Sequence, residues 1–455
     1  MNQTLQAAAL QKDVTPPLGT LINGEFQSRY TNKIHDPLYA KSLVLKLGDT
    51  VLVFVVVDIC AMRQDFVDEV KADILRATGV PKSHILISAT HTHSAGAIAE
   101  LLMGHADLIY RKKLHGILVN LVVETLPLLK PAKVAFGAVD APDHVLCRRY
   151  RMAPDYQPFN PVTGKHDLVK TNPFGDEGYI VERNSIPDTQ LGYLAVKGLD
   201  DSWISLLANY SLHYVGDAAR GTISADYFGC FAGRLAEVLS GDDDSFVAMM
   251  SNGTSGEINI WDFMDSSRYP TESHQKSVLI GKGLADRVLQ DLPNLQWEES
   301  PVLAVLYEEL PVQLRKPSPQ ELEVARQIVM DTDYEHITLD KNGYRQVYAR
   351  EQVLLAEFPD EQNFYIQSFR IGTGIIGGLG GEFFAETGLA LKAAITPKKY
   401  FTICLANDYV GYVPPQHEIA LGGYETWRCR TSCLEETAEE KIRNVLLKQI
   451  KEHSS

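Results

Sequence analysis

The residues best suited to chemistry are two histidines two positions apart, His91 and His93, which follow a strand-like apolar segment at 84–88. A strand places residues i and i+2 on the same side, so both imidazoles could face one polar cavity. Neutral imidazole is the side chain that most often binds a transition metal in proteins. Such a pair also occurs on surfaces and in cores without a metal, so a metal site is one of two interpretations.

Three further segments bring polar residues to the end of an apolar stretch. His213 ends the strand predicted over 203–209, where a lone histidine is also typical of a hydrogen-bonded core residue. The loop at 251–259 (SNGTSGEIN) could let backbone N–H groups approach a ligand, or could be a tight turn. The glycine-rich stretch at 375–381 leads to Glu382 at the start of a predicted helix, where a carboxylate could simply match the helix dipole.

Strand and helix signals alternate along the whole chain, and no repeat, low-complexity run or linker divides it. Long apolar strands need cover on both faces. We therefore expect an α/β protein with mixed sheets flanked by helices, layered α-β-β-α, in one large domain over residues 1–455. The predicted strands are 41–47, 50–60, 132–139, 191–196 and 203–209. The first two should form a hairpin across Gly48-Asp49, and the last two should form another across Asp200-Asp201. The predicted helices are 65–78, 108–129, 226–240, 274–289, 319–330, 383–394 and 435–451.

The composition of the chain argues against several classes of partner and indicates a cellular compartment. The chain has 455 residues, of which 45% are hydrophobic, and its 43 Lys and Arg against 58 Asp and Glu give a net charge of -15. This balance argues against nucleic acid and anionic membranes as partners. No apolar run approaches the ~18 residues of a membrane span, and residues 1–12 lack the pattern of a signal peptide. Six scattered cysteines are typical of a reducing compartment. We expect a cytoplasmic protein with a small-molecule substrate and leave its oligomeric state open.

In chain order, these motifs resemble those of the neutral ceramidase family. The similarity extends from about residue 13 to about residue 430. The main matches are His91-Thr92-His93-Ser94, His213, the loop at 252–257 (NGTSGE), Gly381-Glu382-Phe383 and the segment at 409–413 (YVGYV), with lesser matches at 14–17, 35–38 and 422–425.

The resemblance implies a zinc amidohydrolase. Its single Zn²⁺, or another divalent metal, would be held by His91, His213, Glu382 and Tyr412. Two imidazoles and a carboxylate leave a position open for water, and a tyrosine oxygen can complete the site or move aside. Bound zinc lowers the pKa of water to about 7.

Three more residues are candidates for catalysis by the same resemblance. His93 could transfer protons or stabilise an oxyanion. Arg148 stands where the family has an arginine that contacts substrate. Asn259 replaces the serine of the family's Gly-Asp-X-Ser-Pro-Asn motif, and its amide can orient a substrate but cannot shuttle a proton as a hydroxyl could. We expect a short polar pocket with Arg148, Asn259 and Glu257 near its rim.

The departures from the family bear on the substrate. Because the sequence ends at Ser455, we expect it to lack the β-sandwich domain that follows the catalytic part in ceramidases. Together with Asn259, this favours a small water-soluble amide, or an ester, over long-chain ceramide. One alternative is a metal-assisted lyase or isomerase acting on a carbohydrate-derived substrate, and another is a non-catalytic binding protein that keeps the fold. Hydrolysis releases an amine or alcohol, whereas a lyase leaves an unsaturated product.

Overall fold

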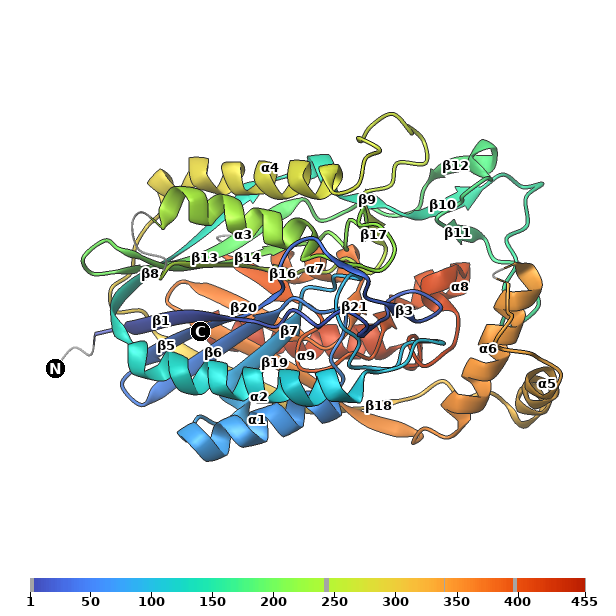
Figure 1. Cartoon of the computed structure of the whole chain (residues 1–455), viewed down its shortest axis with the longest axis horizontal. Coiled ribbons are helices and arrows are strands. Elements are labelled where there is room, and N and C mark those ends of the chain that lie inside the picture. Colours follow the sequence, from blue (N-terminus) through green and yellow to red (C-terminus); the bar gives the residue numbers. More distant parts are fainter. Residues whose placement is uncertain (1–3, 241–244, 339, 396–398, 455) are drawn as a thin grey trace.

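Two β-sheets packed face to face form the centre of the computed structural model, which describes residues 4–240, 245–338, 340–395 and 399–454 (Figure 1). The larger sheet has the strand order β16-β14-β13-β8-β1-β5-β6-β7, and the smaller has the order β18-β19-β20-β22. The strands of the larger sheet are β1 Gln6–Asp13, β5 Tyr39–Leu47, β6 Thr50–Val57, β7 Ile85–Ala89, β8 Lys130–Asp140, β13 Gln190–Gly198, β14 Trp203–Tyr210 and β16 Val247–Asn252. Those of the smaller sheet are β18 Leu303–Gln313, β19 Glu361–Ile371, β20 Gly374–Leu379 and β22 Tyr400–Ile403.

The apolar pattern of β6 shows why the layers form. Phe54 and Val56 belong to the cluster between the two sheets, whereas Val53 and Val55 belong to the cluster under the helices. Successive residues of a strand point to opposite faces, so a strand covered on both sides must be apolar throughout. The unbroken run of apolar residues in β6 is therefore explained by two buried faces.

Helices cover the outer faces of both sheets. On the larger sheet, α1 (Gln64–Thr78) and α2 (Leu108–Thr125) cover one half, and α3 (Asp226–Leu239) and α4 (Gln275–Asp291) cover the other (Figure 1). The smaller sheet is covered mainly by α9 (Ala438–Ser454), beside α7 (Ala385–Ala393). The layering α-β-β-α that the sequence predicted is confirmed.

The two predicted hairpins are also confirmed. β5 and β6 pair antiparallel across Gly48 and Asp49, and β13 pairs antiparallel with β14. The predicted helix at 383–394 begins later, at Ala385. Glu382 and Phe383 instead form the short strand β21, which pairs in parallel with β23 (Tyr412–Val413). The expectation that Glu382 opens a helix was therefore wrong, because backbone pairing with a distant segment takes priority there.

The remaining elements lie around the ends of the sheets. Among them, α5 and α6 project at the right-hand end of Figure 1, beside the small sheet of β10, β11 and β12. Their bounds are β2 Leu21–Ile22, β3 Arg29–Tyr30, β4 Lys33–Ile34, β9 Leu146–Cys147, β10 Arg149–Met152, β11 Val169–Thr171, β12 Ile180–Arg183, β15 Thr222–Ile223, β17 Ile258–Asn259, α5 Pro319–Met330, α6 Lys341–Ala356 and α8 Gln416–Leu421.

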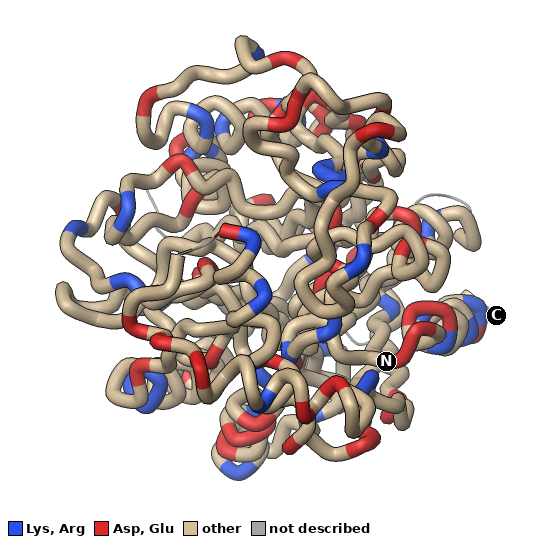
Figure 2. Tube along the Cα trace, turned by 90° about the vertical axis from the view of Figure 1, so that its right-hand side faces the viewer, with Lys and Arg blue, Asp and Glu red and all other residues tan. Residues whose placement is uncertain are grey.

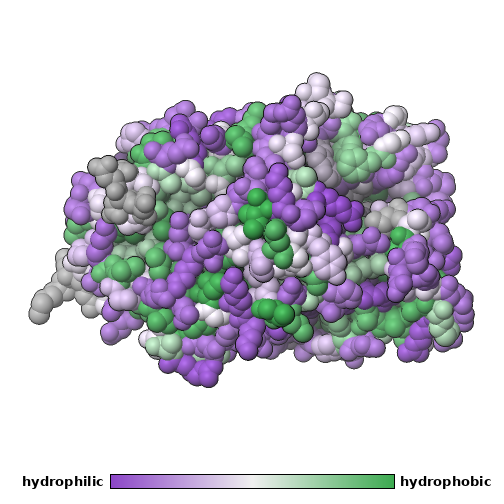
Figure 3. Space-filling model, viewed as in Figure 1, coloured by the Kyte–Doolittle hydropathy of each residue, from purple (hydrophilic) through white to green (hydrophobic). Residues whose placement is uncertain are grey.

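The surface is mixed in both charge and polarity. Acidic and basic positions are interspersed over the end of the molecule that Figure 2 shows. On the face drawn in Figure 3, hydrophobic residues are scattered among hydrophilic ones. Among the described residues, no helix combines the length and the apolar character that a membrane crossing requires.

Candidate metal centre

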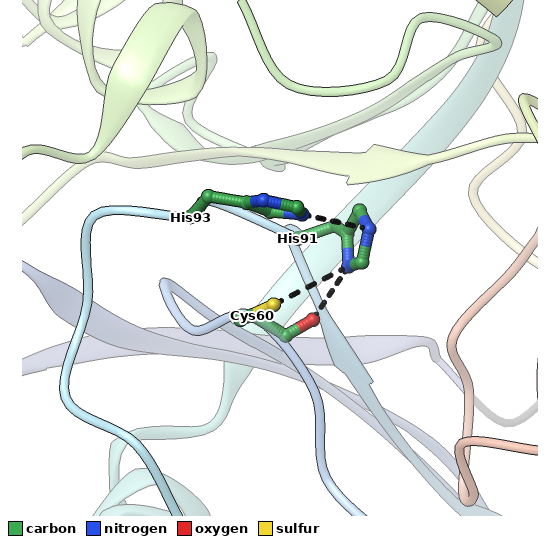
Figure 4. A group of neighbouring side chains, drawn as sticks. All are labelled: Cys60, His91 and His93. Carbon is green, nitrogen blue, oxygen red and sulfur yellow. Dashed lines mark hydrogen bonds between the residues drawn. The ribbon is translucent and has the colours of Figure 1, made fainter. Parts of the chain in front are cut away.

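His91 lies in the loop that follows β7, with a positive φ of 72°. Its Nδ1 lies 2.7 Å from the carbonyl oxygen of Cys60 (Figure 4). A carbonyl oxygen only accepts hydrogen bonds, so Nδ1 carries the ring proton and Nε2 presents a lone pair. A left-handed backbone is strained for a residue with a side chain, and such strain is concentrated at functional sites.

His213 is fixed in the same way from another part of the chain. It follows β14, and its Nδ1 lies 3.1 Å from the carbonyl oxygen of Ser255. Burial lowers the pKa of His213, and Arg148 nearby lowers it further, so the ring is neutral at neutral pH. Its Nε2 is therefore also available as an electron-pair donor.

The two histidine loops are tied together by Asn252 at the end of β16. Its Nδ2 donates to the carbonyl oxygen of Thr90, beside His91, at 3.3 Å. Its Oδ1 accepts from the hydroxyl of Ser255 at 2.6 Å. One buried amide thus links the loops that hold His91 and His213.

Glu382 completes a group of three donors. Its Oε2 lies 3.6 Å from Nε2 of His91 and 3.5 Å from Nε2 of His213. The hydroxyl of Tyr409 donates to the other oxygen, Oε1, at 2.8 Å. Oε2 is buried and has no hydrogen-bond partner among the described residues. A buried carboxylate oxygen without a donor is costly unless a cation occupies the space in front of it.

These three donors fit a divalent transition metal. Zinc binds histidine nitrogen and carboxylate oxygen at about 2.0–2.2 Å in tetrahedral geometry, which separates neighbouring donors by roughly 3.4 Å. The distances of 3.5 and 3.6 Å from Glu382 to the two imidazoles are close to that separation. Three protein donors also leave one position open.

Tyr412, the fourth predicted ligand, stands beside Glu382. The two residues are directly paired in the parallel strands β21 and β23, so their side chains emerge on the same face. The hydroxyl of Tyr412 accepts a hydrogen bond from Nη2 of Arg148 at 3.0 Å. Burial raises the pKa of this phenol, and the nearby Glu382 raises it further. Its role as a ligand stays a prediction.

Arg148 is held in a buried ion network. Its Nε donates to Glu425 at 2.8 Å, and its Nη2 donates to the carbonyl oxygen of Gly256 at 2.7 Å as well as to Tyr412. Glu425 also accepts from Arg149 at 3.0 Å, and Arg149 contacts Glu418 at 2.8 Å. The Nε and Nη2 atoms of Arg148, which is predicted to contact substrate, therefore already have hydrogen-bond partners within the protein.

His93 borders the metal candidates without joining the group of three. Its Nε2 lies 3.1 Å from Nε2 of His91 (Figure 4). Its ring stacks on Tyr214 with centroids 3.6 Å apart, and a Cβ on Gly24 would lie 2.7 Å from its Cγ. Burial and the neighbouring His91 lower the pKa of His93, and its buried Nδ1 has no partner among the described residues.

His91 and His93 are close together, but not because they alternate along a strand, as the sequence predicted. Both lie beyond the end of β7, so strand alternation does not bring them together. The left-handed backbone at His91 and the clamp of Gly24 and Tyr214 on His93 do so instead.

The other two pocket residues face elsewhere. The Nδ2 of Asn259 donates to Asn172 at 2.8 Å, and its Oδ1 accepts from the backbone of Trp261. Glu257 is fully buried and accepts from the N-terminal amide of α7 at Ala385. Burial raises the pKa of Glu257 to about 8. Neither contact directs these side chains to the group of three donors, and Glu257 is not at a rim.

Tyr409, Tyr214 and Glu425 contact the candidate site residues, although the sequence predicted no role for them. Tyr409 and Glu425 stand inside matched motifs, so the motif order could have drawn attention to them. Tyr214 directly follows His213, and this adjacency was the only signal for it.

No family model matches the chain, and no curated protein matches it in sequence. Its structure is similar to the crystal structure of neutral ceramidase from Pseudomonas aeruginosa, with a TM-score of 0.68 and 16% sequence identity. A structure described as ceramidase complexed with C2 matches equally well. Each comparison covers 98% of this chain and 74% of the other. The chain therefore shares the fold of these ceramidase structures over nearly its whole length, as the sequence resemblance predicted.

Proposed function

We propose that the protein is a metal-dependent hydrolase that cleaves an acyl amide bond. The observation that carries the proposal is the convergence of His91 Nε2, His213 Nε2 and the unpartnered Oε2 of Glu382. The fold shared with ceramidase structures supports the same reaction class. Zinc, or another divalent metal, would lower the pKa of a bound water and polarise the substrate carbonyl.

The surrounding residues have chemically distinct tasks in this proposal. His91, His213 and Glu382 hold the metal, and Tyr412 is the candidate for a fourth ligand. His93 is neutral and borders the site, so it can accept a proton from the attacking water and return it to the leaving nitrogen. Arg148 orients the hydroxyl of Tyr412 and keeps positive charge beside it, which favours a developing oxyanion.

The substrate is proposed at the level of an N-acyl amide. The similar structures are named as ceramidases, and this favours a lipid amide over the small water-soluble amide, or ester, that the sequence suggested. No contact of the described residues specifically favours the lyase or isomerase alternative. A cytoplasmic location and a single zinc per chain stay predictions.

Metal analysis and product detection test the proposal together. Purified protein should contain about one transition metal per chain, and a chelator should abolish amide cleavage until metal is restored. Long-chain ceramide, a short-chain ceramide and small water-soluble amides should be assayed in parallel for release of free amine. His213→Ala should lose metal and activity, whereas His105→Ala, at an exposed histidine outside the site, should keep both. Full metal retention in His213→Ala would contradict the role of His213 as a metal ligand. Detection of an unsaturated product would show that the enzyme is a lyase and not a hydrolase.

A further inference from the structure

A cavity of about 910 Å³ lies between α5, α6 and the loop at 159–165, away from the candidate metal centre. None of His91, His213 and Glu382 lines it. A row of aromatic side chains lies between the cavity and Tyr412. Tyr348 lines the cavity and contacts Trp427, Trp427 contacts Tyr424, and Tyr424 contacts Tyr412. A cavity of this size is large enough for a single small molecule.

Two helical stripes form the walls of the cavity. On α5 the lining residues Glu321, Val324, Ala325 and Ile328 recur at the spacing of one helix face. On α6 the stripe from Arg345 to Gln352 has the same spacing. Because Val324 is 54% exposed, the apolar stripe of α5 is not fully covered by the protein.

The charge of the lining contrasts with that of the chain. Lys165, Lys341, Arg345 and Arg428 line the cavity, and Glu321 is the one acidic residue among the described lining residues. Glu321 is already paired with Arg428 at 3.1 Å.

The other three cations have no carboxylate partner in the described part of the chain. The ammonium of Lys341 instead lies 4.5 Å from the centre of the Phe159 ring. The cavity therefore combines unpaired positive charge with exposed apolar surface in a protein of net charge -15.

We propose that this cavity binds an amphipathic organic anion, whose alkyl part contacts Val324 and Ile328 and whose carboxylate lies among Lys165, Lys341 and Arg345. Apolar walls alone would favour a neutral molecule, and cations alone would favour inorganic phosphate. Their combination favours a ligand with both features. The proposal is independent of the metal centre and concerns a second site.

Titration calorimetry with octanoate, decanoate, decanol, acetate and phosphate tests the proposal on the full chain. Decanoate should bind roughly fifteenfold more tightly than octanoate, because it has two more methylenes and each buried methylene adds about a fourfold gain. Decanol, acetate and phosphate should all bind more weakly than decanoate. The affinity for decanoate should fall with added salt, since exposed cations are screened. Equal binding by phosphate and decanoate, or no binding of decanoate, would overturn the proposal.

Matched variants locate the site. Arg345→Glu should weaken decanoate binding by roughly tenfold at low salt, and Val324→Trp should weaken it by filling the cavity. Arg326→Glu makes the same charge change at an exposed residue of α5 that does not line the cavity, and it should leave binding unchanged. Equal affinities in Arg345→Glu, Val324→Trp and the unmodified protein would place the ligand elsewhere and refute the proposal.

Two further measurements distinguish binding in this cavity from binding at the metal centre and from binding to a lipid surface. His213→Ala should bind decanoate normally, which keeps this test distinct from that of the metal centre. Vesicles of anionic phospholipid should not bind in place of the monomeric anion. Binding to vesicles without binding of decanoate would refute the small-molecule site and would indicate a surface that binds lipid membranes.

Discussion

Replacing Tyr409 by phenylalanine should weaken metal binding without unfolding the protein. The Tyr409 hydroxyl donates to Oε1 of Glu382 at 2.8 Å, while Oε2 of the same carboxylate faces the two histidines. The hydrogen bond therefore sets which oxygen would be directed at a bound metal. Phenylalanine keeps the ring and removes only this donor.

The expected loss of metal affinity in Tyr409→Phe follows from the burial of Tyr409 and from the charge of Glu382. Tyr409 is 4% exposed and Glu382 is 3% exposed, so bulk water has little access to replace the lost hydroxyl. A hydrogen bond to a charged group contributes about 1.5–3 kcal/mol. Loss of a partner that orients a metal ligand costs 10–100-fold in affinity, which corresponds to about 1.4–2.7 kcal/mol. Both values predict a metal dissociation constant between roughly 10 and 100 times that of the unmodified protein.

Competition with a chromophoric chelator measures the dissociation constant, and a thermal melt of the metal-free protein measures stability. Tyr400→Phe is the matched control, because the hydroxyl of Tyr400 is also buried and lies 2.8 Å from that of Thr402, in the core of the smaller sheet. Both variants should lose stability, but only Tyr409→Phe should lose metal affinity. Equal metal affinities in the two variants would refute the orienting role of Tyr409.

Three other substitutions test separate parts of the site. His93→Ala should lower kcat by roughly 10²-fold while metal content stays near normal, and a metal-loaded variant with full activity would exclude a role in proton transfer. Glu425→Gln should destabilise the protein by about 3 kcal/mol in denaturant unfolding, because it leaves buried arginines without their shared carboxylate, and an unchanged midpoint would contradict this. Glu257 has a folded-state pKa of about 8, above its usual 4.5, so its contribution to stability is full below pH 4.5 and is lost as the pH rises through 8. Glu257→Gln should therefore flatten the fall in stability between those pH values in a series of thermal melts, and an identical pH profile would show that another group titrates.

Local patterns in the sequence determined the layers of the fold. The unbroken apolar run of β6 predicted a strand buried on both faces, and the Gly48-Asp49 turn predicted its antiparallel partner β5. Polar residues at the ends of apolar strands pointed to the segments around His91 and His213. Each of these signals extends over about ten residues, which is the range over which strand and helix periodicity acts.

Only the tertiary structure decided how the site is assembled. Glu382 belongs to a strand and not to a helix because it pairs with Tyr412, and no local pattern specifies a two-residue parallel pair. The Nε of Arg148 donates to Glu425, which lies 277 residues further along the chain. Contacts of this kind depend on how the sheets and loops pack as a whole, since periodicity fixes the face of an element but not its distant neighbours. The sequence thus indicated the candidate site residues, whereas packing determined which of their atoms lack a partner within the described part of the protein.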